Sequence, residues 1–300
     1  LPRVGIARVS FGVRSESRDG LVDLESGSPG TELDSRDNFG ARFALGLDIS
    51  DCVVADYRFD YTDVDQMPPH SQLYSVTPSN ALFTAAAAYA SKDREDSVAT
   101  NWPGYEQLEL KGHALTLGWD INDTNTLRSI TSYRDLRNDD SVDLDGVPLT
   151  IATANRISDY DQTSQELQWI GSASRLNYVL GLYYYEDDGY TINPHVFFFG
   201  TDSSQYGFGA ESMAAYAQFD FRATDALTLT AGLRYTDEDK DTERYKSVTG
   251  AGAPIARVEA DKSFSDTTPM ASVAYRFSEQ LNVYLKYSEG FKSGGFMGEA

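Results

Sequence analysis

The sequence NFGARFALGLDISDCVVADYRFDYTD, residues 38–63, decides the fold class. Apolar side chains occupy every second position from Phe39 to Ile49, and they do so again after the short turn 50–52. Small and charged residues fill the positions between them. A strict period of two is typical of a β-strand with one apolar and one polar face. The stretch therefore predicts a β-hairpin with strands at 38–49 and 53–64.

The same alternation returns on either side of a second short turn, 223–226. Together the two hairpins supply twenty-one positions on apolar faces, and none of them is charged. Because 24% of the chain is charged, random placement would put about five charges there. One face of the sheet therefore avoids charge, as a face turned toward lipid does. Packing of one sheet on another in a soluble protein would produce the same pattern.

The order of turns and loops separates these two alternatives. Further strands are predicted near 3–18, 105–121, 126–138, 162–171, 176–190, 211–222, 227–242, 263–277 and 281–291. Short turns between them alternate with long loops at 65–104, 139–161, 191–210 and 243–262. Outer-membrane barrels have short turns on one side and long loops on the other, whereas soluble sandwiches have no reason to. The pattern predicts an all-β fold, an antiparallel transmembrane β-barrel.

Composition excludes several other classes of protein. The 300 residues contain 25 Lys and Arg against 46 Asp and Glu, a net charge of −21, so no nucleic-acid partner is expected. A single cysteine, Cys52, excludes an internal disulfide and a cysteine-built zinc site. No apolar run approaches the roughly 20 residues of a membrane helix. The 19 Tyr and 15 Phe lie mostly near predicted strand ends, as in the aromatic girdle of a membrane barrel, although β-propensity alone also enriches them.

Nothing in the sequence indicates catalysis or a resident cofactor. There is no nucleophile elbow, HExxH motif or P-loop, so an enzyme is not expected. His70, His113 and His195 lie on separate segments, which argues against a shared metal site. The acidic stretch 138–146 departs from the EF-hand pattern, because Ala152 stands where the closing Glu belongs. It predicts a solvated acidic loop, with occasional Ca²⁺ binding as the minority alternative.

Three stretches resemble one family. Residues 281–297 read LNVYLKYSEGFKSGGFM, and residues 227–239 read LTLTAGLRYTDED. A third stretch, 164–185, begins SQELQ and ends in a GLYY motif followed by Tyr185. In combination these resemble the barrel strands and loop entries of TonB-dependent outer-membrane receptors. The resemblance implies a plugged barrel of 22 strands, of which this chain holds about half.

The resemblance also carries expectations about function and location. It implies active uptake of bulky nutrients such as ferric siderophores across the outer membrane of a Gram-negative bacterium, energised by the partner protein TonB. Residues 1–300 are expected to form part of a single barrel domain, cut from a longer protein, without the plug domain, the TonB box or the C-terminal strands. Two alternatives stay open: a passive porin-like channel, and a soluble all-β domain that binds or hydrolyses carbohydrate.

Five residues are candidates for ligand contact. Phe197, Phe198 and Phe199 are consecutive aromatics in a predicted extracellular loop, where they could meet an apolar or aromatic ligand. Packing against neighbouring loops is the alternative for them. Arg58 and Arg234 are predicted to face the lumen, where they could meet an anionic ligand or pair with lumen acids.

Overall fold

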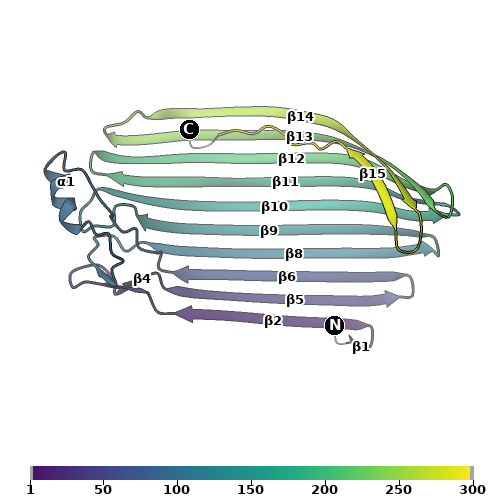
Figure 1. Ribbon diagram of the computed structural model, residues 1–300, viewed down its shortest axis with the longest axis horizontal. Coiled ribbons are helices and arrows are strands. Elements are labelled where there is room, and N and C mark those ends of the chain that lie inside the picture. The colour runs from purple at the N-terminus through teal and green to yellow at the C-terminus, as the bar shows by residue number, and fades with distance from the viewer. Residues whose placement is uncertain (1–2, 298–300) are drawn as a thin grey trace.

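The computed structural model describes residues 3–297, which form one large antiparallel sheet and a small second sheet (Figure 1). Along the chain the elements are β1 (Arg3–Val4), β2 (Ala7–Arg18), β3 (Val22–Leu24), β4 (Glu32–Leu33), β5 (Arg36–Ser50), β6 (Val53–Gln66), α1 (Ala81–Ala86), the 3₁₀ turn η1 (Ala87–Tyr89), β7 (Ser97–Val98), β8 (Tyr105–Asn122), β9 (Asn125–Asp143), β10 (Ala152–Ala173), β11 (Leu176–Phe197), β12 (Gly200–Arg222), β13 (Leu227–Gly250), β14 (Ile255–Arg276) and β15 (Asn282–Ser288). The large sheet has twelve strands in the order β1-β2-β5-β6-β8-β9-β10-β11-β12-β13-β14-β15. Each strand pairs with its neighbour along the chain, so the sheet is a continuous meander.

One face of this sheet is apolar and uncovered. Cross-strand pairing places Trp119 beside Leu127, and Leu127 beside Trp169, in a single row across β8, β9 and β10. Trp119 is 49% exposed and Leu182 of β11 is 59% exposed. A soluble sandwich buries such a face under a second sheet, but no element in residues 3–297 covers it. This arrangement argues against the soluble alternative.

A repeated tyrosine–acid pair marks the upper edge of the apolar face. Five strands that run in the same direction each carry Tyr followed two residues later by Asp or Glu: Tyr61/Asp63, Tyr133/Asp135, Tyr184/Glu186, Tyr235/Asp237 and Tyr287/Glu289. The tyrosine is the ninth residue of β6, β9, β11 and β13. In four pairs the phenol donates a hydrogen bond to the acid above it. We call this row the tyrosine–acid belt, and it separates the apolar band from the acidic strand extensions.

The strands continue well beyond the belt, which corrects three of the predicted loops. Only residues 144–151 connect β9 to β10, residues 198–199 connect β11 to β12, and residues 251–254 connect β13 to β14. Beyond the belt both faces of the sheet meet water, so the apolar–polar alternation disappears from the sequence. The backbone ladder does not depend on that alternation, and it continues without a change of register between β11 and β12 up to Phe197.

The fourth predicted loop, 65–104, is a genuine long connection that folds into a cap. With residues 19–35 it forms the three-stranded sheet β4-β3-β7 around Val22, Leu33 and Val98. Asn80 caps the N-terminus of helix α1, and its side chain accepts a hydrogen bond from the Phe83 amide. None of the helices in residues 3–297 is long and apolar enough to cross a membrane. The cap lies at the same end of the sheet as the β11–β12 turn and opposite the turns 51–52 and 123–124 (Figure 1).

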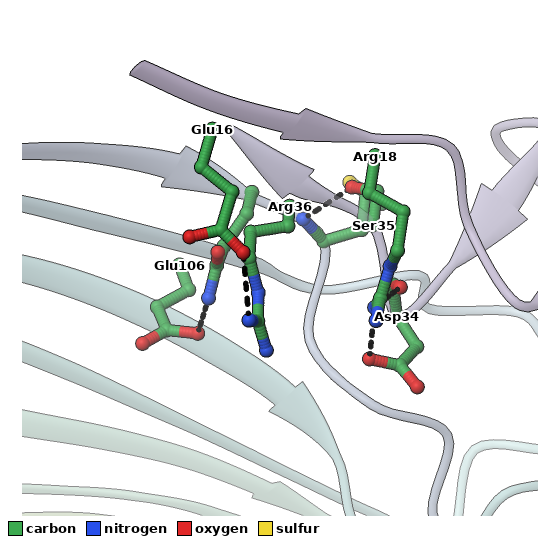
Figure 2. Close-up of polar contacts among 8 residues, drawn as sticks. Glu16, Arg18, Asp34, Ser35, Arg36 and Glu106 are labelled. Atoms are coloured by element: carbon green, nitrogen blue, oxygen red, sulfur yellow. Dashed lines mark hydrogen bonds and ion pairs between the residues drawn. The ribbon is translucent and has the colours of Figure 1, made fainter. Parts of the chain in front are cut away.

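Polar contacts attach the cap to the first strands of the sheet (Figure 2). Arg18 of β2 donates to the backbone carbonyl and the carboxylate of Asp34, at 2.5 and 3.0 Å. One residue later in the same connection, the Ser35 hydroxyl accepts from the Met67 amide at 3.0 Å. Two cap segments far apart in the sequence are therefore joined at the ends of β2 and β6.

Candidate ligand-binding surface

The aromatic candidates occupy the tip of the β11–β12 hairpin. Phe197 is the last residue of β11, and Phe198 and Phe199 are the two residues of the turn. The Phe197 and Phe199 rings stack with centroids 5.1 Å apart, and Phe198 meets Phe199 edge-on at 5.0 Å. Phe83 of α1 makes an edge contact with Phe198 at 5.4 Å. The rings pack against one another and against the cap, yet Phe198 and Phe199 stay 47% and 48% exposed.

Polar groups brace the hairpin tip on its other side. Asp202 accepts a hydrogen bond from His195 Nδ1 at 2.9 Å. It also forms an ion pair with Lys246 Nζ at 3.2 Å. His195 also stacks on the Phe197 ring, with centroids 5.9 Å apart. Burial acts to raise the pKa of Asp202, but the bonds from His195 and Lys246 outweigh it and hold that pKa below its ordinary value. The carboxylate thus links β11, β12 and β13 at the point where the aromatic tip begins.

Arg234 lies on the polar face of β13, where its guanidinium is close to two tyrosine rings. Its guanidinium stands 5.4 Å from the ring centroid of Tyr183 and 5.8 Å from that of Tyr216. The Tyr216 hydroxyl donates to Glu166 at 2.5 Å, so the ring that supports the arginine is itself fixed. Arg234 Nε donates to Thr236 Oγ1 at 3.1 Å, and the guanidinium forms no ion pair with a described acid.

Arg58 is also on the polar face, but it is remote from Arg234. Its cross-strand neighbours are Ala44 and Ala114, whose small side chains leave the guanidinium exposed. No described residue forms a hydrogen bond or an ion pair with it. Five strands separate β6 from β13 in the sheet. The structure therefore places the aromatic tip, Arg234 and Arg58 on one wall without bringing them into contact.

The acidic stretch 138–146 differs from its sequence prediction, because Asp143 is buried and Asp145 is partly buried. Asp143 is only 7% exposed and accepts from Thr100 Oγ1 at 2.7 Å and from the Asp145 and Gly146 amides. Asp145 accepts from the amides of Val147, Ile151 and Ala152, and burial raises its pKa. These acids fold the turn between β9 and β10. Within residues 3–297, no group of three or more His, Cys, Asp or Glu side chains could hold a metal ion.

Comparison with known proteins supports the same architecture. The family model described as TonB dependent receptor-like, beta-barrel matches residues 31–298, which is most of the chain. The chain belongs to this family. TonB-dependent receptors are transporters and receptors of the Gram-negative outer membrane, so the apolar face of the sheet corresponds to their lipid side and the polar face to their lumen.

Several solved receptors share the fold at low sequence identity. The ferric yersiniabactin uptake receptor FyuA from Yersinia pestis is 16% identical with a TM-score of 0.74, and the match covers 94% of this chain and 42% of that one. The ferric-catecholate import receptor Fiu from E. coli K12, in its open form, is 13% identical with a TM-score of 0.68, covering 96% and 51%. The siderophore receptor PiuA from Acinetobacter baumannii is 13% identical with a TM-score of 0.65, covering 94% and 45%. This chain spans about half the length of each.

The tyrosine–acid belt is the feature that sequence reasoning missed. The collective placement of the tyrosines favours a girdle, with β-propensity as the alternative for each residue, but it does not predict the acid two positions later. The signal was present in the sequence as YTD, YRD, YYE, YTD and YSE at the five sites. This motif predicts the position along each strand at which the apolar band ends.

Proposed function

We propose that this chain is part of the barrel wall of an outer-membrane receptor that takes up ferric siderophores or similarly bulky nutrients with energy delivered through TonB. Residues 1–300 would lie within a single barrel domain, completed by further strands and a plug elsewhere in the natural protein. Family membership and the ligands of the matched receptors support this class of cargo. The chain itself would take part in no catalysis and hold no resident cofactor.

The aromatic hairpin tip is the observation that carries the proposal. It presents Phe198 and Phe199 half exposed at the cap end of the wall, held in position by Phe83 and by the Asp202 linkages. Exposed aromatic rings at a fixed place suit the capture of an aromatic or apolar ligand. Below the tip, Arg234 and Arg58 would offer positive charge to an anionic complex as it enters the lumen.

Uptake by the complete natural protein tests the proposal. The receptor would be expressed in a Gram-negative host that lacks its own siderophore receptors, and radioactive iron uptake would be measured with a panel of ferric siderophores. Uptake of at least one complex, lost when TonB is deleted, is the expected result. Uptake that persists without TonB, together with open conductance in planar bilayers, would instead establish a passive channel.

Substitution at the tip tests the candidate residues. Replacing Phe197, Phe198 and Phe199 together with Ser is expected to weaken ligand affinity at least tenfold, because the apolar contact surface is lost. Tyr74→Ser is the matched control, since Tyr74 is an exposed aromatic residue of the cap outside the tip. Equal affinity of the triple variant and the parent would remove the tip from the binding surface.

A further inference from the structure

The segment that follows β15 leaves the sheet and crosses its polar face (Figure 1). The ladder between β14 and β15 ends where the Glu289 amide donates to the Pro269 carbonyl at 3.0 Å. A regular antiparallel pair of this kind exchanges two hydrogen bonds, but proline has no amide hydrogen to return. β14 continues above this level to Ile255. The proline therefore marks the place where the chain departs from the wall.

Residues 290–296, GFKSGGF, form a strap against the polar face of β13. Lys240 Nζ donates to Ser293 Oγ at 2.7 Å and to the Gly294 carbonyl at 3.1 Å. The Ser293 hydroxyl donates in turn to Glu238 Oε1 at 2.6 Å, and Lys240 Nζ lies 2.9 Å from the same carboxylate oxygen. The ammonium, the hydroxyl and the carboxylate thus close a triangle of contacts. We call these three side chains the latch.

The latch is a charged contact that is largely screened from water. The side chains of Lys240 and Glu238 are 25% and 18% exposed. Burial acts to raise the pKa of Glu238, but the bonds from Ser293 and Lys240 outweigh it and hold that pKa below its ordinary value. Hydrogen bonds between charged groups are stronger than those between neutral ones. The latch therefore fixes the strap at a defined place on the wall.

Two glycines set how the strap can lie. At Gly294 a Cβ atom would lie 2.8 Å from two carbons of the Phe264 ring, which is closer than van der Waals contact allows. Glycine lets the backbone approach the wall this closely. At Gly290, where the chain has just left the ladder, a Cβ atom would meet nothing within 4 Å. The strap thus fits closely at its centre and is free to pivot where it leaves the sheet, as a hinged element does.

The latch lies on the route that a cargo would take. Glu238 and Lys240 follow the belt residue Tyr235 by three and five positions, so the latch is just above the apolar band on the lumen face. A chain segment laid over that face narrows the lumen of the complete barrel. We propose that residues 290–296 are a hinged strap that narrows the lumen while the latch is closed and leaves the wall to let cargo pass. The inference rests on the proposed function, because it places a movable element on the path of that cargo.

A nitroxide spin label on the strap of the complete receptor in detergent tests the latch. The label would be attached at Lys292→Cys, an exposed strap position, after the exposed Cys52 has been replaced by Ser. Lys240→Met removes the charge and the donors of the latch, so the rotational correlation time of the label should shorten at least twofold. Lys262→Met is the matched control, because Lys262 is the exposed cross-strand neighbour of Lys240 on the same face and takes no part in the latch. It should leave the label unchanged.

Cross-linking tests whether the strap has to move. In the same background without Cys52, Glu238→Cys/Ser293→Cys places two thiols at the latch, which dibromobimane joins and marks by fluorescence. The cross-linked receptor should still bind its cargo, but uptake should fall at least tenfold compared with the same variant before treatment. Thr242→Cys/Ala260→Cys is the control, because these two residues pair across β13 and β14 and their cross-link joins strands of the wall only. Uptake by the control should not change on treatment.

The outcomes separate this inference from the proposed function. A spin label that Lys240→Met leaves unchanged, or a latch pair that dibromobimane does not join, overturns the strap. Heat-dependent gel mobility would verify that each variant is folded. TonB-dependent uptake of a ferric siderophore that the latch cross-link leaves unchanged refutes the strap alone. A strap released by Lys240→Met in a receptor that takes up no ferric siderophore refutes the proposed function alone.

Discussion

Gly146, in the turn between β9 and β10, packs so closely against the cap that no larger side chain fits there. It has a φ of +65°, and a Cβ atom there would lie 1.6 Å from the Ser71 carbonyl oxygen. The residue sits in the turn that Asp143 and Asp145 hold with hydrogen bonds to backbone amides. Backbone conformation and steric contact therefore both require glycine.

Gly146→Ala is expected to destabilise this turn locally. The strain of about 1–3 kcal/mol adds to the clash with Ser71 and lowers the free energy of local opening. Hydrogen exchange of the Val147, Ile151 and Ala152 amides should become faster by at least tenfold. Gly290→Ala is the control, because a Cβ atom at Gly290 would meet nothing within 4 Å. Unchanged exchange in the Gly146 variant would contradict this account of the turn.

Asp202 gives the hairpin tip a pH dependence whose sign follows from its pKa. Burial opposes ionisation, yet the bonds from His195 and Lys246 place the folded-state pKa below the ordinary 3.8. The ionised carboxylate therefore contributes stability that is fully present above about pH 4 and is lost as the pH falls through the lower folded-state value.

Amide protection at residues 195–202 should consequently stay constant down to about pH 4 and fall on further acidification. Asp202→Asn should show weak protection at pH 5 and little further change on acidification. Hydrogen exchange measured along this series checks the prediction. A parent protein and an Asp202→Asn variant with the same pH profile would exclude this carboxylate as the titrating group.

Among the elements, an aromatic ring contact joins α1 to the β11–β12 hairpin. Phe83 of α1 meets Phe198 of the hairpin turn edge-on, with ring centroids 5.4 Å apart. A double-mutant cycle of Phe83→Ala and Phe198→Ala should give a coupling of about 0.5–1.5 kcal/mol in the opening free energy of the Phe83 amide. The pair Phe83→Ala and Phe208→Ala should show none. A coupling near zero for the first pair would mean that the helix is held by other contacts.

Sequence reasoning recovered the elements within the apolar band and missed those outside it. The hairpins at 38–64 and 211–235 were predictable because lipid-facing positions exclude charge, which leaves a period of two. Above the belt that constraint ends, so β13 runs to Gly250 where a loop from 243 was expected. The aromatic tip was recognisable from three consecutive Phe residues. The contact between Lys240 and Ser293 was not, because it depends on the point at which β15 leaves the sheet.

At the scale of the whole molecule, the large sheet has two open edges. Within residues 3–297, β2 pairs on one side only with the two-residue β1, and β15 pairs only with β14. Unpaired backbone groups cannot be satisfied in hydrocarbon. Residues 1–300 expressed alone are therefore expected to aggregate or to remain in detergent as heterogeneous species. Size-exclusion chromatography and liposome insertion assays check this, and a monodisperse membrane-inserted form of the isolated chain would contradict it.

The tyrosine–acid belt also sets a hydrophobic thickness. Eight residues separate the start of each of β6, β9, β11 and β13 from its tyrosine. That is about 27 Å along the strand, and a tilt of about 40° reduces it to about 20 Å across the bilayer. This span is shorter than the roughly 30 Å of an average bilayer, and bacterial outer membranes are thinner than average. The acids above the belt resist being drawn into hydrocarbon, so a thicker membrane would have to thin around the protein, and hydrophobic mismatch would work against its residence there.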